Sequence, residues 1–465
     1  MLFYTVMKPV VQLALRVFFR KLEIRHRNRL QTSGPLLIAS NHPNTLMDPL
    51  VVAANRREPV FFLAKSTFFK NPILRAVMES GNCIPVYRRQ DTESGAEKLT
   101  PDEITARNEA AFSRSYDHFD RGGTLMIFPE GTSVSERRLR PLKTGAARIA
   151  LGAEARHDFQ LGLQILPIGI NYFDPTHFRS DVLVNPARLI RVADYADAYR
   201  QDPEAAADAL TEEIRRRMEK HLVITRDASE DELVLNIERT FGDHLNPDDD
   251  PDTLYDNFQL SRTLLQAVAY FEQHDPERLH EVRDRLTAYL ADLNRLRLTD
   301  EALEPQEPRS SRLSRAVRTT AKLVLGLPVY LYGVANNYVP YILPSVVAKR
   351  ATKDVEFVAP LLLSVGIITF SASYAAQTAL VHYYTKDWRW TALYFLSLPI
   401  TGFYALSYWN NLEARRYRLR ASKLFRQHPS EGENLLQQRA DILRLLSEAS
   451  QEYLAGRQKL NSDNN

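Results

Sequence analysis

The chain has 465 residues, of which 44% are apolar and 25% are charged, so it can bury a sizeable core and is long enough for two or three domains. Its net charge of +3 is too small to indicate a nucleic-acid-binding protein. The single cysteine, Cys83, excludes an intrachain disulfide and favours a reducing compartment. We expect no cleaved signal peptide, because no small-residue cleavage site follows the apolar N-terminal stretch.

Residues 1–29 are predicted to begin with an amphipathic helix. Lys8, Gln12, Arg16 and Arg20 recur every four positions and would form one polar stripe on an otherwise apolar helix. This pattern is typical of a helix that lies in the membrane interface, and the basic segment that follows is expected to contact anionic head groups. The alternative is a core helix of a soluble domain.

Residues 30–200 alternate short apolar runs with helical patterns, which predicts an α/β domain with a mixed, largely parallel sheet flanked by helices. In such sheets the chemistry lies beyond the carboxyl ends of the strands. The expected strands are 36–39, 60–64, 83–87, 124–128, 164–169 and 182–185, and the expected helices are 44–55, 71–80, 104–121 and 144–155.

The first motif follows the strand 36–39. Pro43 favours an extended conformation for His42, and we expect a helix to begin at Asn44. The side chain of Asp48, about one turn inside this helix, would then reach back to the His42 imidazole. A histidine backed by a carboxylate has the layout of a general base and its orienting group.

Two further motifs carry polar groups at strand ends. Arg88 and Arg89 follow the strand 83–87, as a phosphate-binding site requires, and the alternative is a solvated strand end. Cys83, within this strand, is interpreted as a packed residue. The strand 124–128 ends in a turn whose Glu130 is predicted either to bind a substrate hydroxyl or to hold the loop. This turn comprises Phe128, Pro129, Glu130, Gly131 and Thr132, and Lys143 lies just before the next predicted helix; the family resemblance described below assigns these residues to the substrate site.

A fourth motif, residues 165–172, is an apolar strand with one proline, interpreted as the structural floor of the pocket. Backbone N–H groups near Gly131 or at the helix start after His42 are the predicted donors to a tetrahedral oxyanion. We expect no metal ion, because no cluster of His, Cys and carboxylate residues has ligand spacing.

In this order and spacing, the four motifs resemble those of the glycerolipid acyltransferase family, the glycerol-3-phosphate and lysophosphatidate acyltransferases. The resemblance implies that His42 deprotonates the acceptor hydroxyl, Asp48 orients it, and the alkoxide attacks an acyl-CoA or acyl carrier protein thioester. It further implies that Arg88, with Arg89 beside it, binds the acceptor phosphate, and that the segment 128–131 contributes to acceptor binding.

Two positions differ from the commoner family pattern. Five residues separate His42 from Asp48, as in a subset that includes fungal enzymes acting on glycerol-3-phosphate or dihydroxyacetone phosphate. Ser133 stands where the family often has Arg, so the phosphate site must be completed by another cation, with Lys143, Arg137 and Arg138 as candidates. Together these features favour glycerol-3-phosphate as the acceptor.

Residues 201–316 are predicted to be charged amphipathic helices followed by a linker, acting as a cap or spacer. The membrane segment is 317–412, with transmembrane helices at about 357–381 and 390–410 joined by a short turn. Basic residues on both flanks predict that they are cytoplasmic. The alternative is two buried helices. The stretch 323–347 contains three prolines and is expected to be broken or re-entrant, with an additional membrane span as the alternative. Residues 413–465 are expected to be a cytoplasmic helical tail that packs on the middle helices or on another chain.

The sequence thus predicts an integral membrane acyltransferase with its catalytic domain on the cytoplasmic face, acting on glycerol-3-phosphate, an acyl thioester and membrane phospholipid, without a bound cofactor. The nearest alternative acylates lysophosphatidate. An alternative of another class is a catalytically inactive membrane lipid-binding protein. A hydrolase is disfavoured, because no serine lies in a nucleophile elbow.

Overall fold

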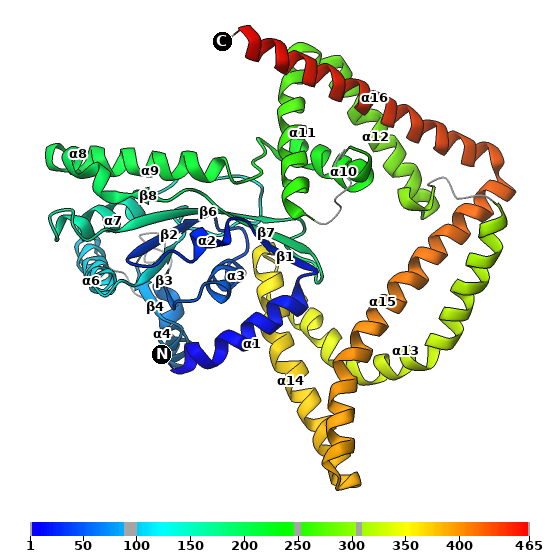
Figure 1. The fold of residues 1–465 in the computed structure, drawn as a ribbon, viewed down its shortest axis with the longest axis horizontal. Helices are drawn as coiled ribbons and strands as arrows, with labels where there is room; N and C mark the ends of the chain where they lie inside the picture. Colours follow the sequence, from blue (N-terminus) through cyan, green and yellow to red (C-terminus); the bar gives the residue numbers. More distant parts are fainter. Residues whose placement is uncertain (1, 88–99, 246–252, 304–308, 464–465) are drawn as a thin grey trace. The chain divides into compact units, whose positions relative to one another are not determined.

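The computed structural model describes residues 2–87, 100–245, 253–303 and 309–463, which form two compact units (Figure 1). Unit 1 comprises Met1–Ile224, Asp252–Tyr255 and Ala348–Ser364. Unit 2 comprises Thr225–Pro251, Asp256–Val347 and Val365–Asn465.

Unit 1 is built on an eight-stranded sheet with the order β1-β7-β6-β2-β5-β3-β4, with β8 paired to β6. The pairs β6–β7 and β6–β8 are antiparallel and the others are parallel, so the predicted mixed, largely parallel sheet is confirmed. The strands are β1 Lys21–Ile24, β2 Leu36–Ser40, β3 Val60–Lys65, β4 Cys83–Val86, β5 Thr124–Ile127, β6 Gln164–Tyr172, β7 Asp181–Pro186 and β8 Ile190–Arg191.

Helices cover both faces of this sheet (Figure 1). Helices α7 and α9 lie on one side, where they share a core with alternate residues of the central strands, while α1 and α3 lie on the other. Strand β2 is buried along its whole length, as expected for a central strand covered on both faces. The helices of unit 1 are α1 Leu2–Phe18, α2 Arg27–Leu30, α3 Met47–Asn55, α4 Pro72–Ser80, α6 Pro101–Asp120, α7 Gly145–Ala155, α8 Ala196–Gln201 and α9 Pro203–Glu219.

Strands β1 and β8 were not among the predicted strands. β1 lies within the basic segment expected to contact head groups, but it pairs in parallel with β7, and Arg20 beside it forms an ion pair with Asp181. The four residues of β1, KLEI, are too few to show an apolar alternation, so its pairing with β7 was not visible in the sequence.

The amphipathic helix predicted at the N-terminus forms as α1, but Lys8 and Gln12 of its polar stripe face the protein, while Arg16 is exposed. Gln12 donates to the carbonyl of Ala54 at the end of α3, and Lys8 donates to the carbonyls that follow. The apolar side chains on the other face of α1 are 40–64% exposed. This arrangement leaves an apolar helix face available to a membrane interface; it consists of Phe3, Val6, Val10 and Leu13.

Unit 2 is helical, and the tail α16 packs on α12, as one of the two predicted alternatives requires. A shared core holds residues of α10, α12, α15 and α16. The helices that lie wholly or largely in unit 2 are α10 Ala228–Leu245, α11 Leu254–His274, α12 Pro276–Leu296, α13 Arg309–Ala351, α14 Val358–Thr385, α15 Trp388–Gln427 and α16 Pro429–Asp463.

The expectation that 323–347 is broken was wrong, because α13 runs through it continuously. A proline removes the N–H that would bond the carbonyl four residues earlier. Pro340 and Pro344 therefore leave the carbonyls of residues 336 and 340 without a helical hydrogen bond. Two side chains of α14 donate hydrogen bonds to these carbonyls instead. Gln377 donates to the carbonyl of Asn336 at 3.0 Å, and Thr369 donates to that of Pro340 at 3.1 Å.

The predicted helical hairpin is present as α14 and α15. At its turn, His382 bonds to Thr391 at 3.1 Å and its ring lies 4.1 Å from that of Trp388. Within the described residues, one segment, Val355–Thr385, is long and apolar enough to cross a membrane, and 17% of its most apolar stretch is buried. The expected span 390–410 lies inside α15, but it is not among the segments that are long and apolar enough to cross a membrane. A second membrane-spanning helix therefore stays a prediction.

Candidate active site

His42 and Asp48 meet at the carboxyl end of the central strand β2. The distance from His42 Nδ1 to Asp48 Oδ2 is 2.8 Å, the contact that the sequence predicted. The helix begins later than expected, since α3 starts at Met47 and residues 44–46 form a turn. Asp48 therefore lies in the first turn of α3, where a negative charge is favoured by the helix dipole.

The Asp48 carboxylate is fully buried and accepts three hydrogen bonds. Besides His42, the N–H of Asn44 donates to Oδ2 at 2.8 Å, and the hydroxyl of Tyr172 donates to Oδ1 at 2.8 Å. Burial, with the adjacent Asp48 carboxylate, raises the pKa of Tyr172 well above its usual value, so this hydroxyl stays protonated and keeps donating. Three donors compensate the buried charge and fix the orientation of the carboxylate.

This hydrogen bond assigns the proton of the neutral His42 ring to Nδ1 and leaves the lone pair on Nε2. The His42 side chain is 19% exposed. Its ring stacks on Phe128, with centroids 3.8 Å apart and an interplanar angle of 12°. No described residue forms a hydrogen bond with Nε2, so this nitrogen is available to take a proton from a substrate.

The loop after β5 holds the histidine through Glu130. Glu130 Oε1 accepts the backbone N–H of His42 at 3.0 Å, and Oε2 accepts that of Arg140 at 3.2 Å. Burial raises the pKa of Glu130, an effect that these two donors oppose. Of the two predicted roles for Glu130, holding the loop is therefore the one that its contacts support.

Gly131 and Lys143 lie against each other at the same loop. Gly131 has φ +73°, a conformation that favours glycine, and a Cβ at this position would lie 2.8 Å from Lys143 Nζ and displace the lysine side chain. The N–H of Lys143 donates to the carbonyl of Pro129 at 2.8 Å. Lys143 is thus a cation held at its backbone beside the loop that contacts His42, and its predicted role in substrate binding stays a prediction. Thr132, also in the predicted site, is half-buried in this loop.

Ser133, which replaces the commoner arginine, fastens the turn after His42. Its Oγ accepts the N–H of Thr45 at 3.0 Å, and Thr45 has φ +35°, a conformation that side chains rarely adopt. The carbonyl of His42 also accepts the N–H of Val134 at 3.2 Å. The Ser133 hydroxyl therefore holds the turn after His42 in place, and it does not supply the positive charge that an arginine would.

Three backbone amides near the predicted oxyanion site are occupied. The N–H of Gly131 donates to the carbonyl of Phe128 at 3.0 Å, and the N–H groups of Asn44 and Thr45 are held as described above. These three amides stabilise the loop, and donation to an oxyanion by other amides of the two segments stays a prediction.

Arg88 and Arg89 fall outside the described residues, so their predicted role in phosphate binding stays a prediction. The strand before them, β4, pairs with β3 as expected. Within the described ranges, no group of three His, Cys, Asp or Glu side chains has the geometry to hold a metal ion.

Sequence reasoning missed two residues that support the histidine. Asn41 pairs with the backbone of Ile170 in β6 through two hydrogen bonds, at 2.9 and 2.8 Å, and fixes the chain where it leaves β2. Tyr172 belongs to the fourth motif, which was interpreted only as a floor. Its hydroxyl could have been noticed as a polar group at a strand end, but the sequence does not show that it reaches Asp48.

Replacement of Tyr172 by Phe is expected to lower the free energy of unfolding by roughly 1–3 kcal/mol, because one oxygen of a buried carboxylate loses its donor. The acyl transfer that the sequence resemblance implies should fall as well, since the Asp48–His42 pair is then less firmly held. Thermal unfolding and initial rates measure the two effects, with Tyr195→Phe as a control away from Asp48. Unchanged stability and unchanged rate would show that the Tyr172 hydroxyl does not matter.

Burial raises the pKa of the Cys83 thiol to about 11, so it is protonated at neutral pH. Alkylation by iodoacetamide at pH 7.5 is therefore expected to be much slower than for free cysteine and to accelerate only as the pH approaches about 11. Cys83→Ala should retain acyl transfer. Rapid alkylation at neutral pH with loss of activity would contradict this interpretation of Cys83 as a packed residue.

Comparison with known proteins gives matches to acyltransferases over part of the chain. Residues 21–171 match the family model described as Acyltransferase. Glycerol-3-phosphate O-acyltransferases 1 and 2 of Saccharomyces cerevisiae are 36% identical over 101 residues and 33% identical over 108 residues. These matches cover 22 and 23% of this chain and 13 and 14% of the yeast enzymes.

A longer match is to an uncharacterized acyltransferase of Schizosaccharomyces pombe, 23% identical over 395 residues, or 68% of this chain and 57% of that protein. The chain thus spans less than two-thirds of the length of each of these relatives. Among solved structures, the 1-acyl-sn-glycerophosphate acyltransferase PlsC of Thermotoga maritima is similar with a TM-score of 0.30 and 17% identity, covering 46% of this chain and 80% of that one.

Residues 21–171 thus match an acyltransferase domain. Over part of its length the chain is similar to two glycerol-3-phosphate O-acyltransferases, in keeping with the resemblance that the four motifs carry.

Proposed function

We propose that the chain transfers a fatty acyl group from an acyl thioester to a hydroxyl of glycerol-3-phosphate. The observation that carries the proposal is the His42–Asp48 pair, which directs Nδ1 to a buried carboxylate and leaves Nε2 available beside a half-buried loop. The names of the two Saccharomyces cerevisiae relatives support the acceptor. The five-residue spacing between His42 and Asp48 points in the same direction.

In the proposed reaction, His42 Nε2 accepts the proton of the acceptor hydroxyl as its oxygen attacks the thioester carbonyl carbon. The tetrahedral intermediate collapses by breaking the carbon–sulfur bond. The leaving thiolate takes the proton from Nε2, which restores neutral His42 and releases the ester and a free thiol. Coenzyme A and acyl carrier protein are the two candidate carriers of the acyl group.

Asp48 would stabilise the imidazolium that forms during transfer and hold Nδ1 protonated, while Tyr172 and Asn44 keep the carboxylate in place. Lys143, with Arg88 and Arg89, is the proposed set of cations for the acceptor phosphate. Phe128 would orient the imidazole through its stacked ring. No bound cofactor is needed for these steps.

We further propose that the reaction occurs at a membrane surface on the cytoplasmic side. The turn Val355–Phe357, which opens the apolar segment Val355–Thr385, lies at the catalytic loop, because Thr45 Oγ1 donates to the carbonyl of Glu356 at 2.9 Å. The exposed apolar face of α1 belongs to the same unit. Both features support a site whose products enter the lipid phase directly.

The proposal is tested by offering the purified full-length chain a long-chain acyl-CoA with glycerol-3-phosphate or lysophosphatidate separately and identifying the products by chromatography. We expect acylation of glycerol-3-phosphate with the higher kcat/KM. If only lysophosphatidate were acylated, the acceptor would be lysophosphatidate and not glycerol-3-phosphate. Absence of transfer to both, with acyl-CoA and with acyl carrier protein, would favour a lipid-binding protein without activity.

A further inference from the structure

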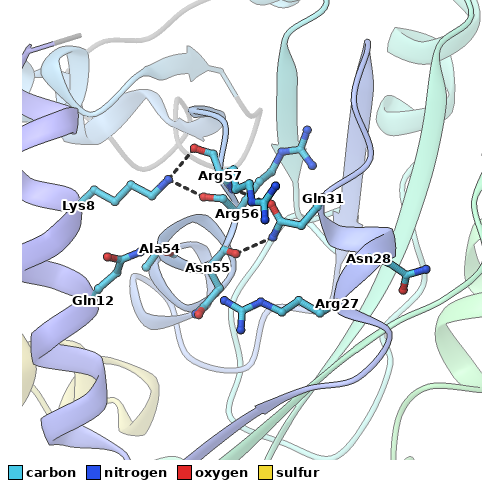
Figure 2. A pocket seen from close by; sticks show the side chains of 9 residues that line it. All are labelled: Lys8, Gln12, Arg27, Asn28, Gln31, Ala54, Asn55, Arg56 and Arg57. Atoms are coloured by element: carbon cyan, nitrogen blue, oxygen red, sulfur yellow. Dashed lines mark hydrogen bonds between the residues drawn. The ribbon is translucent and has the colours of Figure 1, made fainter.

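A cavity of about 760 Å³ lies in unit 1 at the end of α3 that is opposite Asp48 (Figure 2). Asn55 lies seven positions after Asp48 along the helix, which corresponds to about 10 Å along the axis. The cavity is therefore a different place from the His42 site. Its lining residues come from α1, α2 and the end of α3, and they are Lys8, Gln12, Arg27, Asn28, Gln31, Ala54, Asn55, Arg56 and Arg57.

The carbonyl groups at this end of α3 are already occupied by side chains. A helix C-terminus normally presents free carbonyl oxygens, which repel an anion. Here side chains from α1 and from the turn after α2 donate to them. Gln12 donates to Ala54 at 2.6 Å, Gln31 donates to Asn55 at 2.8 Å, and Lys8 donates to Arg57 at 2.9 Å and also to Arg56.

Four cationic residues line the cavity, and no carboxylate does. Arg56 is 1% exposed, and it donates to the carbonyls of Leu30 and Thr32 and pairs with Glu58. Burying a guanidinium is costly unless it is compensated, and the contacts of Arg56 with the backbone give it a structural role. Lys8 likewise has a structural role in capping α3.

No comparable structural contact accounts for the positions of the Arg27 and Arg57 side chains. Both are exposed, and neither guanidinium forms a hydrogen bond or ion pair with any residue that the structure describes. Figure 2 shows Arg27 reaching from α2 toward the end of α3, and Lys8 reaching there from α1. The result is a concave surface with an excess of positive charge, whose donors are arginines suited to planar, bidentate contacts.

We propose that this cavity binds a phosphate group, with Arg27 and Arg57 as its principal contacts. The group can be the head of an anionic phospholipid, since the cavity adjoins α1, whose opposite face exposes apolar side chains, or it can belong to a soluble phosphate. Both sources present the same charged oxygens. The site does not depend on the reaction proposed for His42, so the two proposals can fail separately.

The test measures thermal unfolding of the detergent-solubilised full chain, because a ligand that binds the native state raises the unfolding temperature. One arm titrates inorganic phosphate against chloride at constant ionic strength. The other adds dioctanoyl phosphatidic acid to the micelles, with dioctanoyl phosphatidylcholine as the neutral lipid. We expect at least one anionic probe to stabilise the wild type, and the arm that responds identifies the source.

The variant Arg27→Gln/Arg57→Gln should need roughly tenfold or more of that probe for the same stabilisation, because two charged donors are lost. A matched pair, Arg114→Gln/Arg121→Gln, removes the same charge from exposed positions at α6 and should respond as the wild type does. The proposal is overturned if neither probe stabilises the wild type. It is also overturned if the cavity variant responds normally, or if the matched pair loses as much.

Discussion

Replacement of His42 by Ala is expected to reduce acyl transfer by about 10²- to 10⁴-fold, the usual contribution of a general base. The change removes the atom, Nε2, that takes the hydroxyl proton. It should leave the fold intact, because the backbone N–H of residue 42 still donates to Glu130 and its carbonyl still accepts from Val134. Initial rates and thermal unfolding of the same preparations separate the two effects.

His157 provides a matched control for this variant. It too forms a histidine–aspartate pair, with Nε2 2.8 Å from Asp120 Oδ1, but both side chains are exposed, and Asp120 precedes β5, whose first residue pairs with Leu36 at the opposite end of β2 from His42. His157→Ala should keep wild-type turnover. If His157→Ala and His42→Ala lost activity equally, or if neither did, the assignment of His42 would be wrong.

Replacement of Asp48 by Asn is expected to cost both turnover and stability. The amide cannot accept from all three present donors, and it no longer compensates an imidazolium, so transfer should fall about 10²-fold or more. Because Asp48 is fully buried in a hydrogen-bonded network, the free energy of unfolding should fall by roughly 3 kcal/mol. Chemical denaturation and initial rates measure the two losses.

Asp120→Asn is the corresponding control, since it alters the exposed pair with His157 and should change neither quantity by much. A stable and fully active Asp48→Asn enzyme would remove the basis for Asp48 as the orienting group. A variant that is unstable but turns over normally per folded molecule would restrict Asp48 to a structural role.

The features that the sequence predicted correctly are those determined within a few residues. The apolar run of β2, the proline after His42 and the polar residues near the start of α3 bring His42 and Asp48 together locally. The strand–helix alternation likewise predicted the sheet, and the amphipathic pattern predicted α1. The direction of its polar stripe was not predictable, because it depends on where the end of α3 lies in the fold.

The remaining features depend on contacts between distant parts of the chain. Tyr172 reaches Asp48 across 124 positions, and Asn41 reaches Ile170 across 129. The continuity of α13 depends on Gln377 and Thr369, which belong to another helix. Local preference marks Pro340 and Pro344 as helix breakers, because it does not reveal the side chains of α14 that compensate for them.

The central claim is that Nε2 of His42 takes the proton of the acceptor hydroxyl. The most direct measurement follows the free thiol released from acyl-CoA, with and without glycerol-3-phosphate, for the wild type and for folded His42→Ala. The account predicts thiol release that requires the acceptor in the wild type and falls to near background in the variant. Acceptor-dependent release at the same rate in both proteins would contradict it.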